Sequence, residues 1–131
     1  MAGKTILICD DETVITFMLA SRFRELGYTV VVGSSGTEGQ RLAGETMPAA
    51  IISDYQMPGV DGLEMAKRLK KDERTASIPV LMLTARGHRI SPRDLQETNI
   101  VQVMPKPFSA KELAAMVAEI CGPADEERAA A

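Results

Sequence analysis

The chain has 131 residues, with 15 basic and 18 acidic side chains and a formal net charge of −3 at pH 7. This length supports one domain with a hydrophobic core that needs no disulfide or structural metal, and it leaves no room for a second folded domain. The negative net charge supplies no basic field for holding nucleic acid, so direct nucleic-acid binding is not expected. Aliphatic residues are plentiful while tryptophan is absent, which favours an α/β core over an aromatic-rich binding module.

Cysteine usage and the amino terminus bear on the cellular compartment. Cys9 and Cys121 lie far apart, each within an apolar stretch, and both are predicted to be reduced thiols in the core. Met1–Lys4 leads straight into a short apolar run, so no signal peptide is visible, and no segment approaches membrane-spanning length. A cytoplasmic protein without membrane contact is expected.

The chain begins with a buried strand followed by an amphipathic helix. Thr5–Cys9 is a continuous apolar run of strand length that stops at acidic residues. A helix is predicted from Thr13 to Leu26, and Gly27 is placed to end it. The apolar stripe of this helix, at helical spacing, consists of Ile15, Leu19, Phe23 and Leu26.

The same alternation of strand and helix then continues. Tyr28–Val32 is a β-branched run that predicts the second strand, and Ser35–Glu38 has the Ser-x-x-Glu form of a helix-capping box. Ala49–Ser53 predicts the third strand, which ends at Asp54. Asp61 is placed to cap the following helix, whose predicted inner stripe is Leu63, Ala66 and Leu69.

Two more strands complete the pattern. Pro79–Leu83 predicts the fourth strand, ending at Thr84, and a short helix is predicted from Pro92 to about Thr98. Ile100–Met104 predicts the fifth strand. A further capping box starts at Ser109 and opens the last helix, with Leu113, Val117 and Ile120 inward and Gly122-Pro123 as its stop.

Strands that alternate with helices imply a parallel sheet, because each right-handed crossover returns the next strand in the same direction. We therefore predict one doubly wound α/β domain over residues 1–122. Residues 123–131 are polar and alanine-rich, and we predict them to be a disordered C-terminal tail. This pattern gives the fold class but leaves the strand order open.

The polar residues that interrupt this pattern fall where predicted strands end: Asp10 and Asp11, Asp54, Thr84 and Lys106. The carboxyl ends of parallel strands lie along one edge of a sheet, where ligands of open α/β folds bind. Carboxylates meeting there would raise one another's pKa unless a cation intervened, and hard oxygen ligands suit Mg²⁺. The predicted site is therefore an acidic magnesium site with a lysine beside it.

This set of groups fits phosphoryl transfer to an aspartate. Asp54, kept ionised, can attack a phosphoryl group and form an acyl phosphate, for which positioning and charge neutralisation lower the barrier. Mg²⁺ and Lys106 supply the positive partners, and the Thr84 hydroxyl can donate to a phosphoryl oxygen. Asp54 is thus the candidate nucleophile.

The motifs and their order resemble the receiver domain of two-component response regulators. The match runs through the acidic cluster, Asp54 and Lys106, together with Met57-Pro58-Gly59, Asp61-Gly62, Thr84-Ala85 and Lys106-Pro107-Phe108. The resemblance implies a flavodoxin-like, five-stranded sheet in the order 2-1-3-4-5.

The same resemblance implies that Asp54 accepts a phosphoryl group from a histidine kinase or a histidine phosphotransfer protein. It implies Mg²⁺ bound by Asp11, Asp54 and the Gln56 backbone carbonyl, with Asp10 supporting the ion largely through water. It also implies a cis Lys106-Pro107 peptide. We expect a stand-alone switch, monomeric or dimerising on phosphorylation, that acts on an unknown downstream protein and has no enzymatic activity beyond self-phosphorylation and slow self-dephosphorylation. A receiver that is one part of a larger protein is the open alternative.

One position departs from the family pattern. Three residues before the lysine, where receivers usually carry the Tyr or Phe that swings inward on activation, this chain has Val103. The threonine half of that switch, Thr84, is present. We therefore expect the output surface to move less, or to move through the loop from Arg86 to Ser91.

Several alternatives remain open from the sequence. Asp10 and Asp11 could simply cap the following helix. The chain could be a receiver-like interaction module that is not regulated by phosphorylation, or a phosphoaspartate hydrolase of the haloacid dehalogenase type, although that type needs Asp-x-Asp on its first strand. A mildly basic patch is either solvated surface or a docking site; it comprises Arg86, His88, Arg89 and Arg93.

Overall fold

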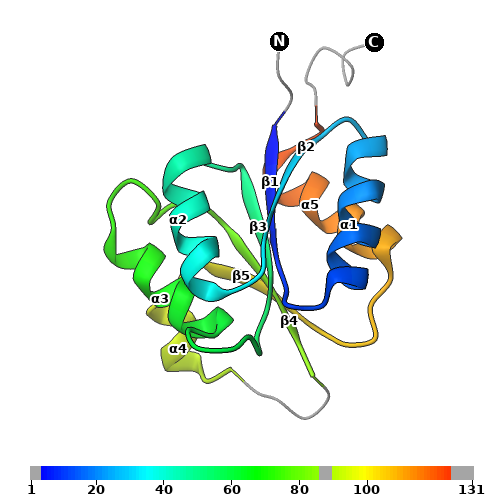
Figure 1. Cartoon of the computed structure of the whole chain (residues 1–131). Helices are drawn as coiled ribbons and strands as arrows, with labels where there is room; N and C mark the ends of the chain where they lie inside the picture. Colours follow the sequence, from blue (N-terminus) through cyan, green and yellow to red (C-terminus); the bar gives the residue numbers. More distant parts are fainter. Residues whose placement is uncertain (1–3, 86–89, 125–131) are drawn as a thin grey trace.

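The computed structural model describes residues 4–85 and 90–124. Its centre is a parallel sheet of five strands in the order β2-β1-β3-β4-β5 (Figure 1). This order confirms the receiver-like topology. The strands are β1 (Thr5–Cys9), β2 (Thr29–Gly33), β3 (Ala50–Asp54), β4 (Val80–Thr84) and β5 (Ile100–Pro105).

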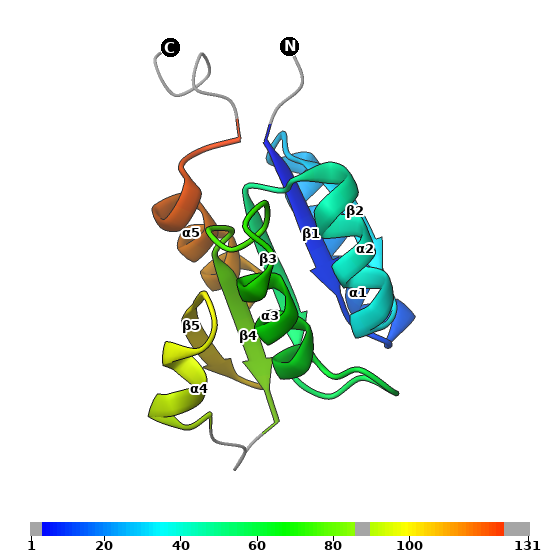
Figure 2. The ribbon, with the colours of Figure 1, turned by 90° about the vertical axis from the view of Figure 1, so that its left-hand side faces the viewer.

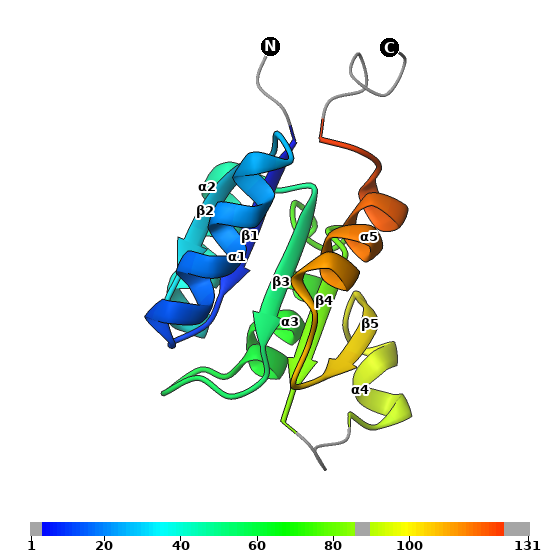
Figure 3. The ribbon, with the colours of Figure 1, turned by 90° about the vertical axis from the view of Figure 1, so that its right-hand side faces the viewer.

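Helices cover both faces of the sheet. One face carries α1 (Thr13–Glu25) and α5 (Ala110–Cys121), and the other carries α2 (Gly36–Thr46) and α3 (Gly62–Lys71) (Figures 1 and 3). The short helix α4 (Pro92–Gln96) lies beside β5 at the edge of the sheet (Figure 2). Within the described residues, no helix combines the length and hydrophobicity needed to cross a bilayer.

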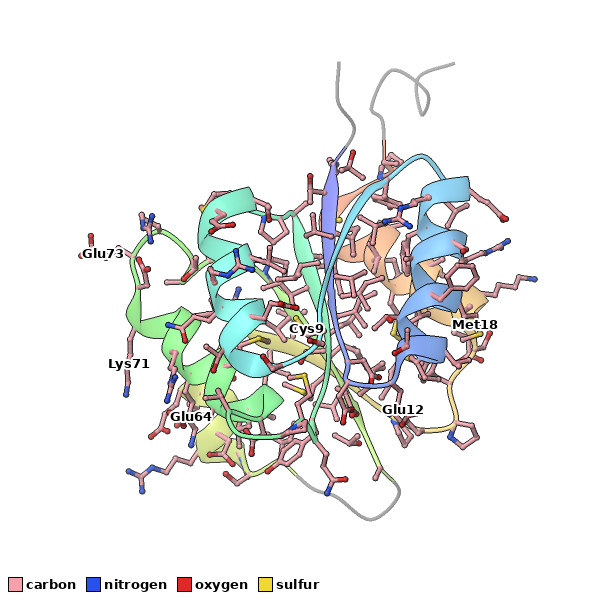
Figure 4. The ribbon with its side chains drawn as sticks, viewed as in Figure 1. Cys9, Glu12, Met18, Glu64, Lys71 and Glu73 are labelled. Carbon is pink, nitrogen blue, oxygen red and sulfur yellow. The ribbon has the colours of Figure 1, made fainter. Side chains whose placement is uncertain are left out.

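Two hydrophobic cores hold these layers together, because successive residues of a strand point to opposite faces. Ile6 and Ile8 of β1 face α1 and α5, whereas Leu7 and Cys9 face α2 and α3. In Figure 4 the Cys9 label lies in the middle of the molecule, between α2 and β1. Each core closes on fully buried helix residues, which include Leu19, Phe23, Leu113 and Val117 on one face and Ala43 and Met65 on the other.

The predicted helix starts are confirmed. The side chains of Ser35, Asp61, Ser91 and Ser109 each accept a hydrogen bond from the backbone N–H of the residue three positions later. These bonds satisfy one of the amide groups that a helix start leaves without a partner. The starts of these four helices therefore follow from local sequence.

Some packing predictions were wrong. Leu26, expected in the inner stripe of α1, is 36% exposed, because α1 ends at Glu25 and Leu26 lies at its C-cap. Met65 of α3, which the predicted inner stripe did not include, is fully buried in the core between this helix and the sheet. Helix α4 ends at Gln96 rather than near Thr98.

Three sequence predictions fall wholly or partly on residues that the structure does not describe. They are the basic patch around Arg86, His88 and Arg89, the movement of the loop from Arg86 to Ser91, and residues 125–131 of the predicted tail.

Candidate functional site

Three carboxylates meet at the carboxyl edge of the sheet, and they come from Asp10 and Asp11 after β1 and from Asp54 at the end of β3. One oxygen from each lies within 4.8 Å of the others. Asp10 and Asp54 are 3% and 6% exposed, whereas Asp11 is exposed. Glu12, labelled in Figure 4, marks this edge at the start of α1. The predicted juxtaposition of these carboxylates is therefore present.

Asp10 does not act as a helix cap. Its Oδ1 accepts a hydrogen bond of 2.9 Å from the Glu12 backbone N–H, and Glu12, the N-cap of α1, makes no side-chain cap bond. Among the buried side-chain atoms of the described residues, Asp10 Oδ2 alone lacks a hydrogen-bond partner. A buried carboxylate oxygen without a donor, beside two further carboxylates, is a donor set suited to a hard divalent cation.

Lys106 supplies the positive charge at this edge. Its Nζ lies 3.1 Å from Asp54 Oδ1 and 3.8 Å from Asp10 Oδ2. The Lys106 backbone N–H donates a 2.7 Å hydrogen bond to the Thr84 carbonyl, which extends the β4–β5 ladder up to the site. The Lys106-Pro107 peptide is cis, as the family resemblance implied. Lys106 thus links the ends of β1, β3 and β5.

Burial and charge act together on the titration of these groups. Burial is the main cause that raises the Asp54 pKa; the Lys106 ammonium partly offsets the rise, and the Asp11 charge adds to it. Burial likewise raises the Asp10 pKa, with the Asp54 charge adding to it. Burial alone would lower the Lys106 pKa, but the two carboxylates outweigh it and leave that pKa raised. The sequence predicts only the repulsion between carboxylates, whereas desolvation raises these carboxyl pKa values more.

The remaining predicted residues lie around this cluster. Thr84 is the last residue of β4 and is 2% exposed; its neighbour Leu83 pairs with Asp54 across the ladder. Gln56 and Asp11 line one hollow of about 400 Å³ formed by the loop after β3. Val103, at the position of the usual aromatic, is partly buried and packs against the core beneath α2 and α3.

Gly62, which the sequence predicts only as part of a helix start, also supports the site. The Gly62 N–H donates to the Tyr55 carbonyl at 2.8 Å, and a Cβ atom at Gly62 would overlap the Asp54 carbonyl oxygen and stand 3.0 Å from Ser53 Oγ. Only a residue without a side chain allows α3 to begin this close to Asp54. The sequence contains a signal for this contact in the Asp61-Gly62 pair. Glycine disfavours a helix, and nothing in the local sequence requires one directly after the N-cap, so its presence there indicates a close approach of another part of the chain.

A doubly wound sheet of this order, with an acidic cluster and a lysine at its carboxyl edge, defines the receiver class of signalling domains. The chain belongs to the response regulator receiver domain family, whose family model matches residues 6–118. This match confirms the resemblance drawn from the sequence motifs. Magnesium and aspartate phosphorylation are typical of that family.

Similar proteins place the chain among two-component regulators. It is 37% identical over 130 residues to the phosphate regulon transcriptional regulatory protein PhoB of Pseudomonas aeruginosa, covering 97% of this chain and 57% of PhoB. It is 38% identical over 112 residues to the DNA-binding dual master transcriptional regulator RpaA of Synechocystis, covering 86% of this chain and 46% of RpaA. The chain therefore spans about half the length of these relatives.

Solved structures with the same fold include isolated receivers. The receiver domain of sensor histidine kinase PA1611 from Pseudomonas aeruginosa, with a magnesium ion coordinated in its active site cleft, superposes with a TM-score of 0.81 at 26% identity, covering 92% of this chain and 99% of that one. Chemotaxis protein CheY4 of Vibrio cholerae gives a TM-score of 0.78 at 27% identity, covering 91% of this chain and 99% of CheY4.

Proposed function

We propose that this chain is a phosphoacceptor switch in which Asp54 receives a phosphoryl group in the presence of Mg²⁺. The observation that carries the proposal is the contact between Lys106 Nζ and Asp54 Oδ1 at 3.1 Å, within a cluster of three carboxylates. In this assignment Asp11, Asp54 and the Gln56 carbonyl hold the ion, and Asp10 supports it. The bound ion neutralises charge on the carboxylates and on the incoming phosphoryl oxygens.

The chain's own residues divide the remaining work. A carboxylate oxygen of Asp54 attacks phosphorus, a P–O bond forms, and the bond from phosphorus to the donor imidazole breaks. Its electron pair leaves with the imidazole nitrogen. Lys106 offsets the negative charge that the phosphoryl group brings, and the Thr84 hydroxyl donates a hydrogen bond to one phosphoryl oxygen. The low exposure of Asp54 limits access of water to the acyl phosphate.

The donor in this proposal is a histidine kinase or a histidine phosphotransfer protein, and a separate protein responds to the phosphorylated state. Two named relatives are transcriptional regulators, and the part of them that this chain matches is about half their length. We assign any DNA contact to a partner or to another domain, because the net charge of −3 offers no basic surface field. The chain itself turns over no separate substrate. The hydrolase alternative loses its basis with the family assignment and with the candidate nucleophile on β3 rather than β1.

The test is intact-mass measurement after incubation with acetyl phosphate, with and without Mg²⁺. We expect one phosphoryl adduct that requires Mg²⁺, is absent from Asp54→Asn and persists in the control Asp72→Asn, since Asp72 lies at the far end of α3. Persistence of the adduct in Asp54→Asn would assign the phosphate to another residue. Absence of any adduct from the native chain, together with no binding of fluoroberyllate, would favour the phosphorylation-independent interaction module.

A further inference from the structure

The turn between β2 and α2, residues 33–36, carries none of the proposed metal ligands, yet it contacts both loops that do. Gly33 and Gly36 are buried. On one side, the Asp10 backbone N–H donates to the Gly33 carbonyl at 3.1 Å, which ties the turn to the acidic end of β1. On the other side, the Gly36 N–H donates to the Val60 carbonyl at 3.1 Å, which ties it to the loop after β3.

The contact between Gly36 and Val60 leaves no space for a side chain. A Cβ atom at Gly36 would overlap the Val60 carbonyl oxygen and stand 2.7 Å from Val60 Cγ1. Val60 belongs to the same loop as Gln56, whose carbonyl is a proposed Mg²⁺ ligand, and Gly62 anchors the other end of that loop against Asp54. The loop is therefore fixed at two points by glycines, and only Gly62 lies next to it in the sequence.

The turn itself is rigidly held. Ser35 Oγ accepts a hydrogen bond from the Glu38 N–H, and Glu38 Oε1 accepts one from the Ser34 N–H at 2.8 Å. Gly33 pairs with Cys9 in the ladder, and a Cβ atom at Gly33 would stand 3.2 Å from the Gly39 amide nitrogen. A turn pinned to the sheet and to α2 can act as a fixed support for the loop that rests on it.

We propose that this turn is a brace that sets the spacing between the β1 end and the β3–α3 loop, and that Gly36 is a positioning residue for the Mg²⁺ site. This inference rests on the proposed function. Metal affinity depends on how well second-layer contacts hold the ligands at their required separation. Gly36 acts through Val60 and the loop backbone, without touching the ion, the phosphoryl group or Asp54.

The test compares Gly36→Ala with Gly44→Ala, both in α2. A Cβ atom at Gly44 meets nothing closer than Arg74 Nη2 at 3.5 Å, so this control tolerates alanine. Isothermal titration calorimetry with Mg²⁺ alone gives the dissociation constant. We expect it to rise about tenfold in Gly36→Ala, the lower end of the range for outer-layer changes at metal sites, and to stay unchanged in Gly44→Ala. Equal affinity in a folded Gly36→Ala would overturn the inference.

A measurement on the native chain removes any dependence on the folding of the variant. Addition of Mg²⁺ should slow hydrogen exchange of the Gly36 amide, because a bound ion holds the loop that carries the Val60 carbonyl. The Met47 amide, bonded to the Ala43 carbonyl at the other end of α2, serves as the control and should not respond. If Mg²⁺ binds and the native chain is phosphorylated while hydrogen exchange of the Gly36 amide is unchanged, the brace is refuted and the proposed phosphoacceptor function stands. If the native protein binds no Mg²⁺, both the brace and the proposed function are refuted.

Discussion

Lys106→Met isolates the electrostatic work of the lysine, because methionine keeps a similar apolar stem and removes the ammonium group. The change takes a cation from 3.1 Å of Asp54 Oδ1 and from 3.8 Å of Asp10 Oδ2, two carboxylates that water barely reaches. Both carboxylates would then stay in a poorly hydrated site without a compensating charge. We expect the metal-free protein to lose stability and the phosphorylation reaction to be lost.

The size of the loss follows from the geometry. Removal of one partner from a fully buried ion pair destabilises a protein by about 3–5 kcal/mol, while a hydrogen bond to a charged group contributes about 1.5–3 kcal/mol. The Lys106 side chain is 24% exposed, so water already screens part of the interaction. We therefore expect the free energy of unfolding to fall by about 2 kcal/mol.

Urea denaturation at pH 7 in the presence of EDTA measures this quantity, with Lys111→Met, an exposed position on α5, as the matched control. A double-mutant cycle with Asp54→Asn assigns the loss to the pair. In the Asp54→Asn background the effect of Lys106→Met should shrink to about 1 kcal/mol, since Asp10 remains as the second partner. If Lys106→Met matches Lys111→Met, or if the two substitutions are additive, the ion-pair reasoning is refuted.

Two further predictions concern titration and reactivity. The raised pKa values of Asp10 and Asp54 mean that these two carboxyl groups bind more protons in the folded state than in the unfolded state. Their contribution to the stability of the metal-free protein is therefore greatest below the ordinary carboxyl pKa of 3.8 and falls as pH rises through the folded values, whereas Asp72 and Asp94, whose pKa values are lowered, contribute in the opposite sense. Urea denaturation across pH should show this decline in the difference between the free energies of unfolding of the native chain and Asp54→Asn, and Mg²⁺ should reverse it at neutral pH; a difference that instead rises with pH without Mg²⁺ would contradict the assignment. Burial raises the Cys9 pKa to about 12, so Cys9 should resist a thiol reagent at pH 8 until urea unfolds the chain, and rapid labelling of the native protein at Cys9, located by peptide mass, would contradict its buried position.

Local chemistry in the sequence determined most of the elements. Ser35, Asp61, Ser91 and Ser109 mark helix starts because a short polar side chain is needed to bond the free amides of the first turn, and each start was found in the predicted place. The continuous apolar runs predicted strands buried on both faces. The residues of the proposed site could be predicted as well, because a parallel sheet brings strand carboxyl ends to one edge whatever the strand order.

The tertiary structure decided which apolar residues enter the core and how the site is supported. Met65 is buried because the sheet covers one arc of α3, and sequence spacing fixes that arc only to within about one residue, whereas Leu26 is exposed because α1 ends before it. Desolvation of Asp54 depends on neighbours from several strands, so the sequence could not rank it above carboxylate repulsion. The approach of Gly36 to Val60 joins segments far apart in the chain, and a glycine that serves such a contact cannot be told from a loop glycine until the fold brings the two backbones together.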